Sequence, residues 1–262
     1  RHAAIAALPP LFLALTLALT EGSSWGWGSL STLGLLIGAV VVLLAVVAAE
    51  SRRSEPLVPR YLLRDRSFQV SLVDGAVIGV AAFSMFFFFS YYLQVAGRLD
   101  ATATGLMFLP MSAALILFAP IGPRFVAKIG PYRTIGVGLA ISAVGVWWAG
   151  STVLAGMGPS TSGLIAPTVV LGVGIGLAFP SVSGLCVAAA APADFGLAAS
   201  AGTMARQVGN AIGIAVFGAI LAPNVDAMTM SDGMRVIGTA AGLLLALAAV
   251  LNMALPSQRD ER

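Results

Sequence analysis

Two charged side chains lie inside long apolar stretches of the sequence, and both could carry chemistry there. Asp74 lies six residues into the stretch 68–95, about 9 Å along a helix, and Arg206 lies eleven residues into the stretch 195–221, about 16 Å along. A charge at the centre of a membrane helix costs about 2.5–3.5 kcal/mol on insertion scales, so each is a functional candidate. We interpret them as intramembrane charges for proton coupling, with Asp74 taking up and releasing the proton. The alternatives are that Asp74 interacts with the positive end of its helix or is partly hydrated, and that Arg206 bonds helix-end carbonyls or braces a neighbouring helix.

A run of aromatic residues between positions 83 and 92 is the second feature that could bind a ligand. It covers more than one face of a helix, so some rings face lipid, and the sequence leaves open which rings face inward. Inward-facing rings would line a cavity suited to lipophilic or cationic compounds. We assign to this substrate cavity two aromatics of the run and the few polar side chains nearby: Phe87, Tyr91, Gln94, Gln207 and Asn210.

The sequence lacks the residue patterns of disulfide frameworks, metal sites and nucleotide-binding loops. The single cysteine, Cys186, excludes a disulfide framework and a cysteine-based metal site, and the single histidine, His2, excludes a histidine-rich one. The glycines between 172 and 176 are not a nucleotide-binding loop, because no strand precedes them. We therefore expect no enzyme activity, no metal and no cofactor.

The composition identifies the class of protein. Of 262 residues, 58% are hydrophobic and only 10% are charged, and the mean hydropathy is +0.96. Soluble domains carry about 25% charged residues, so a cytosolic enzyme, a nucleic-acid binder and a disordered chain are excluded. The net charge is only +3 and the basic residues lie in short loops, which argues against nucleic acid as a partner. Since the chain opens with Arg1 and His2 rather than Met, we expect it to be a fragment or a processed piece.

Eight apolar runs of 18 residues or more account for most of the chain. About 20 residues are needed to cross the hydrocarbon core, and none of the runs alternates with the period of two that a transmembrane barrel requires. Helices are then the remaining solution in lipid, and seven further runs after the first exclude a signal peptide. The predicted fold is an all-α integral membrane protein with spans at Ala3–Thr20, Leu30–Ala49, Phe68–Val95, Ala101–Pro120, Thr134–Leu154, Leu164–Ala191, Phe195–Leu221 and Val236–Leu255.

The lysines and arginines set the predicted orientation. With eight spans, 11 basic residues fall on one side of the membrane and two, Arg98 and Arg235, on the other. Basic residues accumulate in cytoplasmic loops, so we expect a multi-pass plasma-membrane protein with both termini in the cytoplasm.

The longest cytoplasmic segment divides the chain into parts. We expect two spans in residues 1–50, an amphipathic linker on the membrane surface at 51–67, six spans in 68–256 and a cytoplasmic tail at 257–262. Three plus three spans in the third part suggest two inverted three-helix repeats, as in many secondary transporters. We expect helix kinks at Pro110 and Pro180. The frequent glycines are explained either by ordinary close packing or by helices that flex between two states.

Four stretches of the sequence carry a family resemblance: Leu15–Gly22 with Trp25–Gly28, Glu55–Pro59 with Leu62–Phe68, Leu177–Pro180, and Ala205–Gly213. On these the chain resembles the C-terminal portion of a major facilitator superfamily transporter of the fourteen-helix drug:proton antiporter type. The resemblance implies that residues 1–50 are the two extra helices between the transporter halves and that 68–256 is the six-helix C-terminal domain. It also implies a gating loop at 123–133, in which Lys128, Gly130 and Arg133 are the candidate residues, although Pro123 and Ala127 depart from the motif.

The function implied is proton-coupled efflux of lipophilic or cationic drugs or metabolites. Its partners would be a small-molecule substrate, protons, the lipid bilayer and an N-terminal transporter half that the chain lacks. In the family arrangement the third and seventh spans are neighbours, so we expect the Arg206 guanidinium to come within reach of Asp74 or of an ordered water beside it. The alternatives are a facilitator or symporter for a small polar nutrient and a non-transporting membrane scaffold or sensor.

Overall fold

The computed structural model describes residues 59–152, 162–221 and 227–255, together with Ser29, Gly34 and Gly38. The first two predicted spans, most of the predicted linker and the predicted tail lie outside the described residues. Two units separate between Asp65 and Arg66. The described part of the first unit contains the short helix α3 (Arg60–Arg64), in which Leu62 is buried and the other four residues are exposed.

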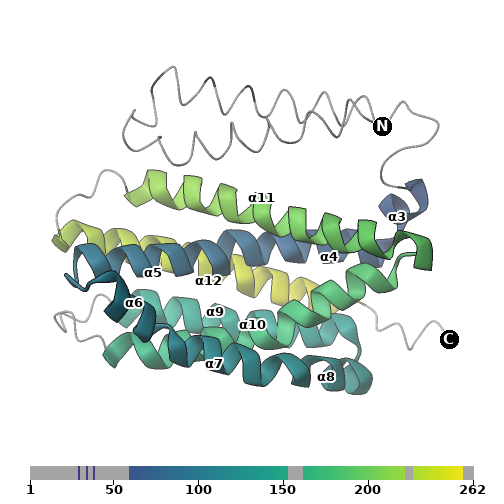
Figure 1. The fold of residues 1–262 in the computed structure, drawn as a ribbon, viewed down its shortest axis with the longest axis horizontal. Coiled ribbons are helices and arrows are strands. Elements are labelled where there is room, and N and C mark those ends of the chain that lie inside the picture. The colour runs from purple at the N-terminus through teal and green to yellow at the C-terminus, as the bar shows by residue number, and fades with distance from the viewer. Residues whose placement is uncertain are drawn as a thin grey trace. The chain divides into compact units, whose positions relative to one another are not determined.

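In the second unit, six helical segments are long and apolar enough to cross a membrane. The described residues are helical throughout, with short turns and no strand, which confirms the predicted all-α class. In chain order the elements are α4 (Arg66–Ile78), the π-helix η1 (Gly79–Phe83), α5 (Ser84–Val95), α6 (Ala101–Met107), α7 (Leu109–Phe118), the 3₁₀ turn η2 (Ala119–Ile121), α8 (Gly122–Ile129), α9 (Pro131–Thr152), α10 (Ser162–Ala188), the 3₁₀ turn η3 (Pro192–Asp194), α11 (Phe195–Leu221) and α12 (Ala227–Ala254). Figure 1 shows the long helices running side by side.

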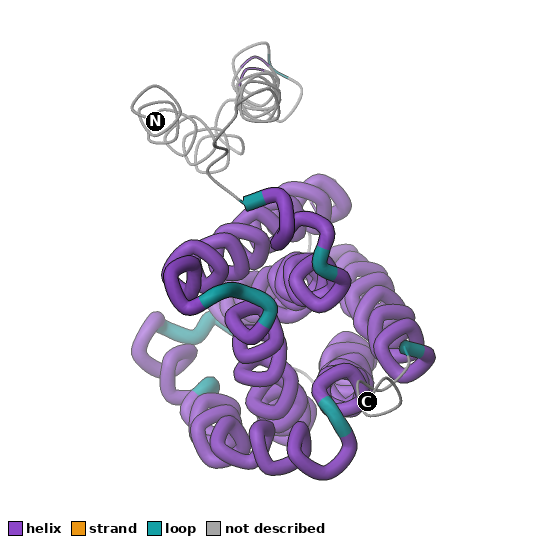
Figure 2. The backbone as a smooth tube through the Cα atoms, turned by 90° about the vertical axis from the view of Figure 1, so that its right-hand side faces the viewer, coloured by secondary structure: helices purple, strands orange, loops and turns teal. Residues whose placement is uncertain are grey.

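Helix α9 packs against both α10 and α12, which are the most extensive helix contacts in the described residues. Figure 2 looks along the bundle from one end. The fully buried side chains at these contacts are aliphatic: Ile135, Leu139, Val146, Leu171, Met234, Ile237 and Leu245. The outer faces of the helices carry large apolar side chains that are exposed, such as Leu243 and Leu247 on α12. An apolar exterior of this kind suits a bundle surrounded by lipid.

Small residues let the helices approach closely. A Cβ added at Gly138 would lie 2.7 Å from the backbone nitrogen of Ala178, and one at Gly145 would lie 2.6 Å from that of Leu171. Such contacts are typical of membrane helices, which associate by close packing rather than by the hydrophobic effect. They bring the backbones of α9 and α10 together.

Two predicted boundaries are wrong. The span predicted at Ala101–Pro120 continues as helix to Ile129. Pro120 and Pro123 each stand in the first turn of a new helical segment. Proline is tolerated there because a backbone N–H in the first turn has no hydrogen-bond partner within the helix. The span predicted from Val236 begins at Ala227. Arg235, expected in a loop, is therefore an exposed residue inside α12.

The prolines expected at kinks lie in different settings. Helix α6 ends at Met107, and Pro110 occupies the first turn of α7, directly after the break at Phe108. Pro180 lies inside α10, which is assigned as one helix from Ser162 to Ala188.

Candidate functional site

Arg206 projects from α11 toward two phenylalanine rings. Its guanidinium carbon lies 5.1 Å from the ring centroid of Phe83 in η1 and 5.2 Å from that of Phe179 in α10. The two rings meet edge to face, with centroids 6.5 Å apart. Arg206 also donates a long hydrogen bond of 3.4 Å from Nη1 to Oε1 of Gln207. Side chains from η1, α10 and α11 thus meet at one cation.

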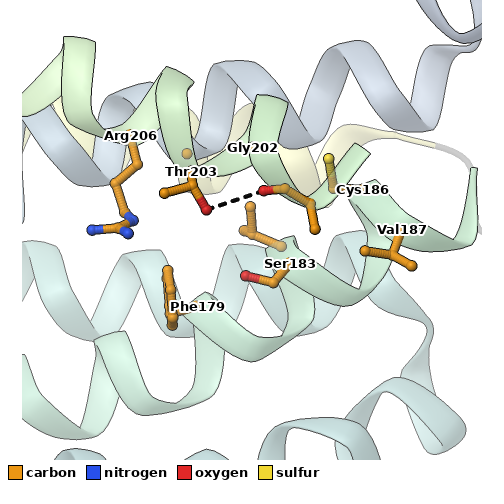
Figure 3. Close-up of a pocket in the computed structure, with 10 residues that line it drawn as sticks. Phe179, Ser183, Cys186, Val187, Gly202, Thr203 and Arg206 are labelled. Atoms are coloured by element: carbon orange, nitrogen blue, oxygen red, sulfur yellow. Dashed lines mark hydrogen bonds between the residues drawn. The ribbon is translucent and has the colours of Figure 1, made fainter. Parts of the chain in front are cut away.

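A cavity of about 130 Å³ lies beside Arg206, mainly between α10 and α11, with Gly75 of α4 at its wall. In Figure 3, Arg206 and Thr203 from α11 face Phe179 and Ser183 from α10. The lining residues are Gly75, Phe179, Val182, Ser183, Cys186, Val187, Ala199, Gly202, Thr203 and Arg206. The cavity is mainly apolar, with a few hydroxyl groups and one guanidinium.

Local hydrogen bonds hold the polar groups of the cavity wall. Thr203 Oγ1 donates to the carbonyl oxygen of Ala199 at 3.0 Å, so its oxygen can still accept a hydrogen bond (Figure 3). Cys186 Sγ donates to the carbonyl oxygen of Ala198 at 3.2 Å, which ties α10 to α11.

Asp74 is bound by an amide from the last helix. Asn252 Nδ2 donates to Asp74 Oδ1 at 2.8 Å and also to the carbonyl oxygen of Ala248 at 3.0 Å. Both side chains are buried, with 2% and 3% of their surface exposed. The second oxygen of each, Asp74 Oδ2 and Asn252 Oδ1, is buried without a hydrogen-bond partner among the described residues.

The expected approach of Arg206 to Asp74 is wrong. Successive residues of a helix point about 100° apart. Gly75 faces α11, where an added Cβ would lie 3.5 Å from the carbonyl oxygen of Gly202, whereas Asp74 faces α12. Arg206 meanwhile finds its contacts with Phe83 and Phe179.

None of the five residues assigned to a substrate cavity lines the cavity beside Arg206. Phe87, Tyr91 and Gln94 are exposed on α5, and Gln94 Nε2 donates to Ser90 Oγ at 3.1 Å. Gln207 is exposed, and Asn210 is half-buried with its Oδ1 unpartnered among the described residues. The structure thus brings Gln207 to Arg206 and leaves the three residues of α5 on the surface of the six-helix unit.

The aromatic residues that do meet Arg206 are Phe83 and Phe179. Phe83 belongs to the aromatic run, whereas Phe179 lies in Leu177–Pro180, one of the stretches that carry the family resemblance, and was not assigned to a site. Asn252 was missed as well, although it is an isolated amide within the predicted span 236–255. That isolation is the signal that could have identified it.

The segment expected to be a gating loop is mostly helical. Lys128 lies in the last turn of α8 and Arg133 in the first turn of α9, and both are exposed. Gly130 ends α8 with φ of +87°, a conformation that other residues adopt only with strain. The connection between α8 and α9 is therefore a tight turn at Gly130. The carbonyl oxygen of Gly130 accepts a hydrogen bond of 2.7 Å from Thr134 Oγ1.

Metal-ligating side chains do not gather in the part of the chain that the structure describes: no three of His, Cys, Asp or Glu come together there.

The chain is similar to several curated membrane transporters and resistance proteins, while no family model matches it. It is 33% identical over 219 residues to an uncharacterized MFS-type transporter of Mycobacterium tuberculosis, a match over 80% of this chain and 31% of that protein. It is 29% identical over 211 residues to the tetracenomycin C resistance and export protein of Streptomyces glaucescens (80% of this chain, 39% of that protein). It is 30% identical over 247 residues to the puromycin resistance protein of Streptomyces alboniger (90% and 48%). The chain therefore spans less than half the length of each of these relatives.

Proposed function

Since the chain is homologous to major facilitator superfamily drug-efflux transporters and resembles their C-terminal portion, we propose that it forms one half of a proton-coupled exporter of lipophilic drugs or metabolites. In this proposal residues 68–256 are the C-terminal domain, 1–50 are two extra helices between the halves, 51–67 are a linker at the membrane surface and 257–262 are a tail. Both termini lie in the cytoplasm and the protein resides in the plasma membrane.

The observation that carries the proposal is the buried carboxylate of Asp74 in a helix long enough to span the membrane. Ionisable residues inside membrane helices mark ion and proton pathways. One proton is sufficient to change the contact of Asp74 with α12. A proton on Oδ2 can be donated to Asn252 Oδ1, so that the two oxygens now lacking a partner satisfy each other. The pair then has two reciprocal hydrogen bonds in place of one.

The packing of α4 and of η1, which directly follows it, suggests how such a change reaches the rest of the domain. A Cβ on Gly79 would lie 2.7 Å from the backbone nitrogen of Asn210, and one on Gly209 would lie 2.8 Å from the Cα of Ala76. Backbones in such contact move together, so a shift of α4 against α12 would be passed to α11. Transport would follow from rocking of this domain against a second one around a site near the midplane.

Everted membrane vesicles that contain the full-length protein test this function. With an acidic interior, we expect at least one fluorescent lipophilic probe, from a set of cationic, neutral and anionic compounds, to accumulate inside and to be lost when an ionophore dissipates the pH gradient. Uptake that only equilibrates the probe and does not depend on the gradient would identify a facilitator, and absence of uptake for every lipophilic probe would favour a scaffold or sensor. A matched pair of variants, Asp74→Asn and the exposed Asp232→Asn, should separate coupling from a general loss of charge, with only the first removing the dependence on the gradient.

A further inference from the structure

Arg206 lies inside a predicted membrane span and has no anionic partner among the described residues. Its contacts among the described residues are two phenyl rings and one amide oxygen. The buried carboxylate of the same unit, Asp74, is turned toward Asn252 instead. A guanidinium stays charged under all physiological conditions. The arrangement is therefore stable in lipid only if a further group satisfies that charge.

The contacts of Arg206 leave its hydrogen-bond donors available. Phe83 and Phe179 contact the guanidinium by cation–π attraction, which uses the charge but none of the N–H groups. A guanidinium has five N–H donors in a planar fork, and Gln207 accepts from one at the long distance of 3.4 Å. The planar fork matches the two oxygens of a carboxylate.

The residues that line the cavity next to Arg206 indicate what the rest of the ligand should be like. Its side-chain groups are apolar, aromatic or hydroxylic, and no carboxylate lines it. A cationic ligand would meet the like charge of Arg206 and would have to compete with it for Phe83 and Phe179. An anionic group on an apolar or aromatic body would gain the guanidinium, the ring of Phe179 and the hydroxyl groups of Ser183 and Thr203.

We propose that the cavity bounded by Phe179, Ser183, Thr203 and Arg206 binds the acidic group of lipophilic aromatic anions, with Arg206 as the charge-recognising residue. The inference rests on the proposed export function and specifies its substrate class: weak organic acids with an aromatic body, rather than permanent cations. A phosphate group of a lipid presents the same chemistry to Arg206, so the test must separate these two sources.

Equilibrium binding to the purified full-length protein in a neutral detergent tests the proposal without requiring transport. The probes are fluorescent pyrenebutyrate and its methyl ester, which share the aromatic body and differ in charge. We expect the acid to bind at least about tenfold more tightly than the ester, the ratio that one charge-assisted pair supplies. Equal affinity of acid and ester, or tighter binding of ethidium than of the acid, would overturn the proposal.

Substitutions locate the preference at Arg206. In Arg206→Gln the affinity for the acid should fall to that for the ester, while binding of the ester stays within about twofold and shows that the site is still folded. Arg206→Lys should keep part of the preference, since it keeps the charge but not the fork. The exposed Arg235→Gln is the matched control and should behave like the wild type. Loss of acid and ester binding together in Arg206→Gln, in a protein that still elutes as a folded species, would reduce Arg206 to a structural brace and overturn the assignment.

Competition separates a substrate from a lipid. Short-chain phosphatidylglycerol that displaces pyrenebutyrate from the wild type with an affinity lost in Arg206→Gln would assign the cavity to a lipid headgroup and contradict the proposal. If binding occurs as expected while vesicles show no gradient-driven efflux, the proposed function fails and the binding site stands. If vesicles show gradient-driven efflux but the protein does not prefer the acid to the ester, the proposed function stands and the proposed anion site fails.

Discussion

Asn252 and Asp74 are 178 residues apart in the sequence and are joined by a hydrogen bond of 2.8 Å between Nδ2 and Oδ1. The bond connects the last helix of the described chain to α4, and both side chains are buried. Each keeps one oxygen without a partner in the described structure. A carboxylate held by a single amide donor is poised to accept one proton, because the neutral acid can return a hydrogen bond to the same amide.

The first prediction concerns the stability of this pair. Asn252→Ala removes the one donor that the described residues give to the buried Asp74 carboxylate, and we expect it to lower the free energy of unfolding by about 1–3 kcal/mol. The exposed amide Gln94 makes only a local bond, so Gln94→Ala should change stability by less than about 0.5 kcal/mol. Thermal unfolding of the full-length protein in detergent measures both. Similar losses for the two variants would show that the buried bond contributes nothing particular. Replacing both Asp74 and Asn252 by leucine should recover part of the loss, because no buried polar group is then left unsatisfied.

A second prediction concerns the close contact between the π-helix and α11. An added methyl group at Gly79 meets the backbone of Arg206 and Asn210, which cannot rotate away as a side chain can. We expect Gly79→Ala to destabilise the protein by about 1–3 kcal/mol. Gly184 on α10 has nothing within 4 Å of an added Cβ, and Gly184→Ala should stabilise by about 0.4–1 kcal/mol. The midpoints of thermal unfolding should therefore shift in opposite directions, and a common direction would argue against the contact.

The third prediction concerns orientation in the membrane. From the distribution of basic residues we expect the turn before α6 to lie outside the cell and α8 to lie at the cytoplasmic side. Single cysteines at Ala101→Cys and Ala127→Cys, both exposed positions, can be introduced after Cys186→Ala removes the native thiol. A membrane-impermeant maleimide added to intact cells should label position 101 and leave position 127 unlabelled until the cells are opened. Labelling of position 127 alone from outside would invert the orientation.

The fold was predictable from the sequence wherever run length determines it. The predicted span Phe195–Leu221 coincides with α11 at both ends, and the span Phe68–Val95 ends where α5 ends. This follows because the bilayer demands about 20 apolar residues and leaves the helix as the only solution. Hydropathy could not reveal the π-helix at Gly79–Phe83, because its five residues are as apolar as their neighbours and the wider turn is a matter of local hydrogen bonding.

The two charged residues of the candidate site were predictable, but the residues that contact them were not. Charge in an apolar run identified Asp74 and Arg206, because that argument needs only the expense of burying an ion. Which partner each one meets depends on the rotation of each helix about its axis. That rotation is set by glycine contacts such as those of Gly75 and Gly79 with α11. The rotation of the helices also determines that Phe83 and Phe179, rather than Phe87 and Tyr91, contact the guanidinium of Arg206.

The claim that one proton on Asp74 couples to substrate has a direct measurement. A pH-indicator dye in weakly buffered solution reports proton release when substrate is added to the purified full-length protein. The account predicts release from the wild type and from Asp232→Asn, and none from Asp74→Asn, even though that variant still binds the substrate. Undiminished proton release from Asp74→Asn would contradict it.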